Sequence, residues 1–263
     1  MAKIIILTSD HLRHKFFVNT LKNYHKVLGV VSESKPITAY GLKAKEEPIV
    51  VDHFKERSER EAAYFGEKNH KFDMEDSAIR SIAFNEANSI ETFEWIKSFS
   101  PETVILFGTA IIKAPLLTFY KDRIINLHLG LSPYYRGAAT NFWPLVNHEP
   151  QCVGATIHKA ILKVDAGDIF MQVRPDISPG DRCHDFGCKT IIKATHAMGK
   201  TISLLENMKI KSFKQPAGGR FYTMKNFTAE AVRTMRQNFE SGMGDDYLYN
   251  KEKYDMQYPI IEQ

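Results

Sequence analysis

Short apolar runs rich in β-branched residues alternate along this chain with segments in which apolar residues recur at helical spacing. The first run covers residues 3–7, a helical pattern follows at 11–21, and a second run covers 27–31. Runs that are apolar on both faces are typical of buried parallel strands, so this opening predicts a β-α-β unit. The same reasoning predicts strands at 79–84, 103–107, 123–129, 153–158 and 169–173, and helices at 89–99 and 181–209. The pattern therefore predicts an α/β fold with a mostly parallel sheet.

The composition excludes several classes of protein. Of the 263 residues, 43% are hydrophobic and 25% are charged, which is typical of a folded globular protein. No apolar run approaches the ~18 residues of a membrane-spanning helix, and the run at 4–7 is shorter than the core of a secretory signal. Three cysteines argue against a disulfide scaffold, so we expect a cytoplasmic protein. A net charge of +4 and an isoelectric point of 8.8 do not indicate a nucleic-acid partner.

The chain divides into a main segment and a tail. The alternation of strands and helices covers residues 1–205, interrupted by a charged insert at 34–75. Acidic and basic residues are mixed at helical spacing in this insert, so we expect a solvated helix there. The tail contains a candidate strand at 220–223 and an amphipathic helix at 227–239. We therefore expect a main domain, followed by a short α+β extension at 206–263.

Two polar side chains, Asn126 and His128, lie two residues apart in the predicted strand 123–129, so they project from the same face of the sheet. Binding sites in open α/β sheets form beyond the carboxyl ends of the strands, where these residues lie. An amide beside an imidazole suits an oxyanion donor and a general acid or base. Asp165 and Asp168 lie in a glycine-containing turn between two later strands, and a carboxylate from this turn would stabilise His128 as an imidazolium.

Four motifs follow one another in the second half of the main segment. They are Asn-x-His at 126–128, Pro-x-Tyr-Arg-Gly at 133–137, Gly-x-Thr at 154–156 and Asp-x-Gly-Asp-Ile at 165–169. In this order they resemble the catalytic domain of the formyltransferase family, which methionyl-tRNA formyltransferase, glycinamide ribonucleotide transformylase and sugar N-formyltransferases share. The resemblance extends over residues 1–205 and is sharpest over 103–173. It implies the Rossmann-like, mostly parallel formyltransferase fold, with a cis peptide bond between Ser132 and Pro133.

The resemblance implies an enzyme that transfers a formyl group from N10-formyltetrahydrofolate to a primary amine. Asn126, His128 and Asp165 match the family's catalytic trio, and Asp168 is expected to be structural. Asn126, helped by His128, would bind the oxyanion, while His128 and Asp165 would move the proton from the amine to N10. The family commonly has Pro-Ser directly after the histidine, where this chain has Leu129-Gly130.

The resemblance also implies where the ligands bind. Folate is expected against two loops, and the residues expected to contact it are Phe107, Ile111, Ile112, Leu162 and Val164. The residues expected to line the acceptor pocket are Tyr134, Arg136 and Asn141. Arg136 would pair with a diphosphate. No metal site is expected, because the cluster Cys183, His184 and Cys188 falls within one predicted helix and lacks a second pair of ligands.

Three branches of the family differ in their acceptor. The turn at 8–15 has no glycine, which disfavours the phosphate nest of the glycinamide ribonucleotide branch. The tail is shorter than the barrel-like second domain of the methionyl-tRNA branch and lacks a basic surface. The stretch 219–228 loosely matches a pattern of non-tRNA members, and Trp143 is a candidate to stack on a base. We therefore expect an amino-deoxysugar linked to a nucleotide, as in surface polysaccharide biosynthesis.

Other interpretations stay open at this point. A methionyl-tRNA formyltransferase-like enzyme, or a formyltransferase for another small amine, would use the same catalytic residues. A non-catalytic folate-binding protein would keep the fold but would not need His128 and Asp165 together. The aromatic residues of the tail would form a homodimer interface or pack onto the chain's own main segment.

Overall fold

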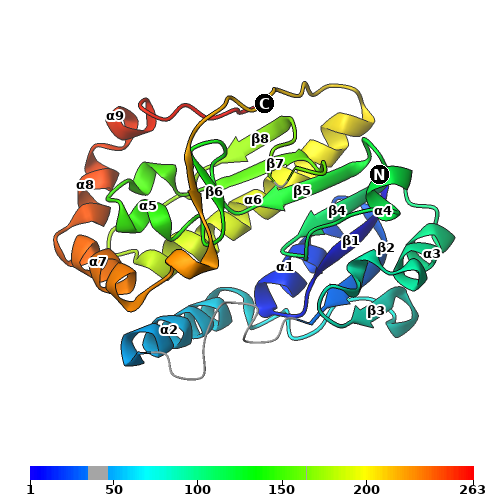
Figure 1. The fold of residues 1–263 in the computed structure, drawn as a ribbon, viewed down its shortest axis with the longest axis horizontal. Helices are drawn as coiled ribbons and strands as arrows, with labels where there is room; N and C mark the ends of the chain where they lie inside the picture. The colour runs from blue at the N-terminus through cyan, green and yellow to red at the C-terminus, as the bar shows by residue number, and fades with distance from the viewer. Residues whose placement is uncertain (35–46, 164) are drawn as a thin grey trace.

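The computed structural model describes residues 1–34, 47–163 and 165–263, and a seven-stranded sheet runs through its centre (Figure 1). In spatial order the strands are β3 (Ile79–Ile82), β2 (Lys26–Glu33), β1 (Lys3–Ser9), β4 (Thr103–Phe107), β5 (Ile124–His128), β7 (Ala155–Lys159) and β8 (Ile169–Val173). The pairs from β3 to β5 are parallel, whereas β7 runs antiparallel to both β5 and β8. The predicted α/β fold with a mostly parallel sheet is confirmed.

Alternate residues of the central strand β1 face two separate hydrophobic cores. Ile4 and Ile6 belong to a core shared with α1 (Leu12–Leu21) and α6 (Cys183–Glu206). Ile5 and Leu7 belong to a second core, shared with α3 (Ile90–Ser98) and α4 (Leu116–Phe119). Helices therefore cover both faces of the sheet, which is why this strand is apolar throughout rather than alternating.

Part of the charged insert forms α2 (Pro48–Phe65), while its residues 35–46 lie outside the described part of the chain. A helix was predicted here, but the prediction that it is solvated is wrong for one face. Val50, His53, Glu61 and Phe65 are buried, and α2 contacts α1, α6 and α7 (Ala229–Glu240). These residues recur at helical spacing among the exposed charges, so they form a narrow stripe that packs inward.

The tail packs onto the main part of the chain. Its predicted strand forms β9 (Arg220–Tyr222), which pairs with β6 (Tyr135–Gly137). Its helices α7, α8 (Met243–Tyr249) and α9 (Lys251–Asp255) curve around α5 (Trp143–Val146) (Figure 1). A third hydrophobic core joins them to Tyr135 and Leu145. A homodimer through this tail stays a prediction.

Trp143 is part of that third core. Its ring stacks on Tyr222 with centroids 4.3 Å apart and planes 7° from parallel, and the residue is only 4% exposed. The expectation that Trp143 stacks on a nucleotide base is therefore wrong, because its face is already covered by an aromatic residue of the tail.

Several short features complete the fold. Single 3₁₀ turns lie at Asp76–Ala78, Glu86–Asn88, Pro150–Cys152 and Met224–Asn226. The Ser132–Pro133 peptide bond is cis, as the resemblance implied, and so is Ala114–Pro115. Within the described ranges, no helix combines the length and apolar character needed to cross a bilayer.

Candidate active site

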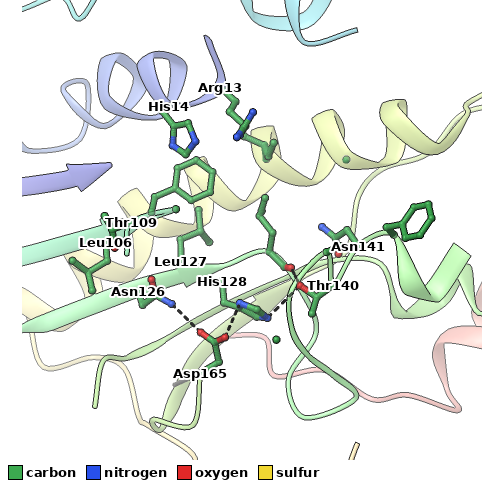
Figure 2. Close-up of a pocket in the computed structure, with 18 of the residues that line it drawn as sticks. Arg13, His14, Leu106, Thr109, Asn126, Leu127, His128, Thr140, Asn141 and Asp165 are labelled. Carbon is green, nitrogen blue, oxygen red and sulfur yellow. Dashed lines mark hydrogen bonds and ion pairs between the residues drawn. The ribbon is translucent and has the colours of Figure 1, made fainter. Parts of the chain in front are cut away.

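Three side chains meet at the carboxyl end of β5 (Figure 2). Asn126 and His128 project from β5, and Asp165 reaches them from the loop that joins β7 to β8. One carboxylate oxygen of Asp165 lies 3.4 Å from Nδ1 of His128. Its other oxygen accepts a hydrogen bond from Nδ2 of Asn126 at 3.4 Å. The structure thus brings together the three residues singled out from the sequence.

His158 on β7 is a fourth member of this cluster that sequence reasoning missed. Its Nδ1 lies 2.9 Å from the backbone oxygen of Lys159, a pure acceptor, so Nδ1 carries the proton. Its Nε2, on the other side of the ring, then accepts a hydrogen bond from Nδ2 of Asn126 at 3.0 Å. The signal was the cross-strand register, in which Asn126 stands opposite His158. That register follows only from the antiparallel pairing, which the sequence pattern did not reveal.

Burial and charge set the protonation states in this cluster. Burial lowers the pKa of His128, and the Asp165 carboxylate opposes this effect without cancelling it. Burial alone would raise the pKa of Asp165, but His128 and His158 outweigh burial and hold that pKa below its usual range. At neutral pH the cluster therefore combines a carboxylate with a neutral imidazole, which is able to accept a proton.

The loop after β5 packs tightly against the second nitrogen of His128. Oγ1 of Thr140 lies 3.4 Å from Nε2 of His128 and donates a hydrogen bond to the backbone oxygen of Leu129. A Cβ atom at Gly130 would lie 2.7 Å from both Nε2 of His128 and Oγ1 of Thr140. Only glycine fits here, at the position where this chain departs from the common family pattern.

The loop that carries Asp165 is also closely packed. Asp165 has a φ of +50°, a left-handed conformation that aspartate tolerates better than most residues. Two residues later, a Cβ atom at Gly167 would lie 1.7 Å from the backbone oxygen of Lys159. The glycine of the Asp-x-Gly turn thus lets the loop lie directly on β7, and this contact places the carboxylate beside His128.

A cavity of about 530 Å³ opens over the cluster. Its lining includes the segment from Leu106 to Ile112 at the end of β4, together with Ala160 and Ile161. It also includes residues from α2 and from the first turns of α6. In Figure 2, Leu106 and Thr109 lie on the Asn126 side of the cluster, whereas Thr140 and Asn141 lie on the His128 side. The cluster therefore sits between two parts of one cavity.

A protein-family model described as formyl transferase matches residues 2–202. The chain belongs to the formyl transferase family.

Curated relatives carry the name methionyl-tRNA formyltransferase. The protein of Geotalea uraniireducens (strain Rf4) is 29% identical over 127 residues, covering 48% of this chain and 40% of the relative. That of Thermotoga sp. (strain RQ2) is 25% identical over 214 residues, covering 79% of this chain and 59% of the relative. The chain thus spans about half the length of the curated relatives that it matches.

Solved structures share the fold. A 4-N formyltransferase from Francisella tularensis superposes with a TM-score of 0.55 at 19% identity, over 86% of this chain and 78% of the other. An N-formyltransferase from Helicobacter canadensis, in complex with folinic acid and dTDP-3-aminofucose, superposes with a TM-score of 0.53 at 18% identity, over 89% and 79%. At these identities the likeness establishes the formyltransferase fold.

Three of the five residues expected to contact folate line the cavity. Phe107, Ile111 and Ile112 all line the cavity, and Ile111 is 56% exposed. Leu162 is 77% exposed and is not among the residues that line it. Val164 lies outside the described residues.

The expected acceptor-contacting residues are also divided. Asn141 lines the cavity, and its Oδ1 accepts a hydrogen bond from the backbone nitrogen of Gly154. Tyr134 and Arg136 are not among the residues that line it. The Tyr134 hydroxyl donates instead to the backbone oxygen of Pro259, which ties it to the end of the tail.

Sequence reasoning assigned no site residue to the charged insert, yet α2 supplies one wall of the cavity. His53, Arg57 and Glu61 line it and lie four residues apart, so they share one face of the helix. That spacing was the signal available in the sequence, hidden among other charged residues.

The predicted placement of Cys183, His184 and Cys188 in one helix is confirmed, since all three lie on α6. In the described part of the chain, no group of three or more His, Cys, Asp and Glu residues is placed to hold a metal ion.

Proposed function

We propose that this chain is an enzyme that transfers the formyl group of N10-formyltetrahydrofolate to a primary amine of a small acceptor. The observation that carries the proposal is the contact of Asp165 with both Asn126 and His128 within one cavity. A protein that only bound folate would not need a carboxylate 3.4 Å from a buried imidazole. Membership in the formyl transferase family supports the same reaction.

The part of the cavity beyond β4 fits a flat heterocycle such as the pterin of the folate. Phe107 and Ile112 form its buried apolar wall, and Ile111 is exposed although it is large and apolar. Glu33 accepts hydrogen bonds from the backbone nitrogens of Asn85 and Ala110, at 2.8 Å each, and thereby holds this loop in place. Bound folate supplies the formyl carbon as the electrophile.

The residues of the cluster then have distinct roles. Asn126 is oriented by its hydrogen bond to His158, and its second N–H, which makes the longer 3.4 Å bond to Asp165, would be shared with the formyl oxygen as negative charge develops there. His128, neutral at pH 7, accepts the proton that the attacking amine loses. Asp165 stabilises the imidazolium that forms, and a protonated Nε2 of His128 would donate to Oγ1 of Thr140, which lies 3.4 Å away. The proton then passes to N10 as the C–N bond to the donor breaks.

An amino-deoxysugar linked to a nucleotide is the acceptor class that we propose. The Helicobacter canadensis structure of the same fold contains dTDP-3-aminofucose, which supports this class. The curated relatives named methionyl-tRNA formyltransferase favour methionyl-tRNA as the second candidate. Within the described residues, the cavity is bounded by α2, α6 and the tail residues Met224 and Phe227, which suits a small acceptor.

The test is to measure tetrahydrofolate release from N10-formyltetrahydrofolate with a panel of amino-deoxysugar nucleotides and, separately, with charged methionyl-tRNA. Turnover with one sugar nucleotide, with the product heavier by one formyl group, is the expected result. Turnover with methionyl-tRNA alone contradicts the sugar acceptor but keeps the reaction. Release without any acceptor indicates a hydrolase, and folate binding without release indicates a non-catalytic protein.

A further inference from the structure

The hydroxyl of Thr140 contacts the nitrogen of His128 that Asp165 does not reach. Oγ1 of Thr140 lies 3.4 Å from Nε2, whereas the Asp165 carboxylate lies 3.4 Å from Nδ1. Figure 2 shows these two contacts on either side of the imidazole ring. Thr140 is buried and comes from the segment between β6 and α5, whereas Asp165 comes from the loop between β7 and β8. The ring is therefore held between groups from two separate segments.

The other hydrogen bond of this threonine leaves only oxygen lone pairs for His128. The hydroxyl hydrogen of Thr140 is donated to the backbone oxygen of Leu129, so Oγ1 is able to accept a hydrogen bond from Nε2 but not to donate one. The Asp165 carboxylate is likewise an acceptor at Nδ1. An imidazole flanked by two acceptors makes both hydrogen bonds only when both of its nitrogens carry a proton. The surroundings of His128 are thus complementary to its imidazolium form.

The charge of His128 also depends on other groups that face it. Burial lowers its pKa, the Asp165 carboxylate raises it, His158 lowers it, and a hydrogen bond with the backbone of Tyr135 raises it. Within residues 1–34, 47–163 and 165–263, the titratable side chains that act on His128 are Asp165 and His158, and the two imidazole rings lie 6.5 Å apart. Thr140 carries no charge, so its hydroxyl acts on the ring through hydrogen bonding.

Gly130 makes room for this threonine. A Cβ atom at Gly130 would lie 2.7 Å from Cβ and from Oγ1 of Thr140, which is far inside the separation of non-bonded heavy atoms. The hydroxyl of Thr156 donates a hydrogen bond of 2.6 Å to the backbone oxygen of Gly130 and so keeps the loop against the ring. The common family pattern has serine at this position. A serine at 130 and the side chain of Thr140 would therefore compete for the same space.

We propose that Gly130 and Thr140 form a coupled pair, in which Thr140 supplies the hydroxyl that the common family pattern carries at position 130 and positions His128 through Nε2 for proton transfer. This inference rests on the proposed function, because the imidazolium forms only if His128 accepts the proton of the attacking amine. Thr140 is a positioning residue, since it contacts His128 rather than the reacting atoms. The pairing also gives a reason for the glycine, because a larger residue at 130 would displace the hydroxyl or the ring.

The first experiment compares Thr140→Val and Thr140→Ser in the full chain. Valine has the shape of threonine without the hydroxyl, whereas serine keeps the hydroxyl. The matched control is Thr195→Val in α6, a buried position that is not among the residues that line the cavity. The Thr195 hydroxyl donates a hydrogen bond of 2.7 Å to the backbone oxygen of Ile191, so the control removes the same kind of bond away from His128. Melting temperature verifies that each variant is folded.

Turnover is measured with N10-formyltetrahydrofolate and the member of the acceptor panel that the wild type uses. Thr140→Val should lower kcat about tenfold or more, because the imidazolium loses a charge-assisted hydrogen bond. The KM for the folate should stay unchanged, and the acidic limb of the pH–rate profile should shift toward acid. Thr140→Ser should restore kcat and the profile. Equal kcat and profile in Thr140→Val and Thr195→Val, or a serine variant no faster than the valine variant, overturns the proposal.

The second experiment exchanges the two residues to test their coupling. Gly130→Ser and Thr140→Gly should each lower kcat. The double variant should be faster than the product of the two single effects by about threefold or more, because glycine at 140 frees the space that the serine needs. Single effects that simply multiply overturn the coupling, and so does a double variant that unfolds although both single variants fold.

Titration of the His128 ring by NMR separates failure of this inference from failure of the proposed function, because it needs no turnover. A pKa of His128 that falls in Thr140→Val but not in Thr195→Val, in a chain that formylates no amine, keeps the positioning contact and removes the reaction. Formyl transfer with the same kcat in Thr140→Val and in wild type removes the positioning role and leaves the reaction.

Discussion

Asp165 places a carboxylate oxygen 3.4 Å from Nδ1 of His128, across the gap between the loop after β7 and the end of β5. His128 is 9% exposed on a central strand, and Gly167 allows the loop of Asp165 to lie against Lys159. Strand β5 thus places the imidazole, and the close backbone contact at Gly167 places the carboxylate beside it.

Replacing His128 with alanine should lower kcat at least about a hundredfold, because a positioned general base contributes roughly 10²–10⁴ to the rate. Binding of a folate analogue should stay nearly unchanged, since the wall that we propose for folate is formed by Phe107, Ile111 and Ile112. Stopped-flow turnover and calorimetric folate binding measure the two effects. Full activity in His128→Ala would remove His128 from the mechanism.

Asp165→Asn should lower kcat and also move the acidic limb of the pH–rate profile. The carboxylate raises the pKa of His128, so its loss lowers that pKa further. His128 then stays neutral to lower pH, and the limb shifts toward acid. Asp168→Asn is the control, because Asp168 accepts a hydrogen bond from the Lys159 nitrogen through its backbone oxygen, which the substitution keeps. A limb that shifts toward higher pH in Asp165→Asn contradicts the assignment.

Gly130→Ala tests how closely the loop after β5 holds the catalytic imidazole. The added Cβ would lie 2.7 Å from Nε2 of His128, so either the ring or Thr140 must move. Displacing a catalytic group by a fraction of an ångström should reduce kcat about tenfold or more, with a stability loss of about 1–3 kcal/mol. Gly244→Ala in α8 is the control, since its nearest heavy atom would be 3.6 Å away. Equal kcat values for the two variants would show that the loop accommodates the added Cβ atom without displacing His128.

Acid should destabilise the folded chain partly through His53. Burial, followed by the charges of His184 and nearby arginines, lowers the pKa of His53 from 6.5 to about 3. Between these two pH values the unfolded chain binds a proton that the folded chain excludes, so stability falls as the pH drops below about 6.5. At pH 5.5 the proton excluded from His53 lowers the free energy of unfolding by about 1 kcal/mol.

Urea unfolding of the wild type and of His53→Gln at pH 7.5 and pH 5.5 measures this cost. The wild type should lose about 1 kcal/mol more of its free energy of unfolding than the variant does. Identical losses would mean that His53 is protonated in the folded state at pH 5.5.

Much of the main sheet and the centre of the site could be predicted from the sequence, because that information is local. Apolar runs such as 103–107 predict buried strands. Side chains alternate between the two faces of a strand, so Asn126 and His128 project from the same face. The Asp-x-Gly motif at 165–167 predicted a turn that carries a carboxylate. Each of these signals depends on neighbours a few residues away.

Other features of the site depend on which segments meet, and the tertiary structure alone decided them. His158 joins the cluster because β7 turns antiparallel and sets it opposite Asn126. The charged insert supplies a wall of the cavity because α2 packs against α1 and α6. Trp143 does not have the expected role of stacking on a nucleotide base, because Tyr222 of β9 stacks on its ring.

The sequence by itself thus determined the parallel core of the sheet and the residues at the end of β5, since periodicity and turn chemistry act within one segment. Only the tertiary structure decided what surrounds those residues. Packing between segments far apart in the chain stabilises these surroundings, and the hydrophobic pattern of one segment does not identify the segment that packs against it.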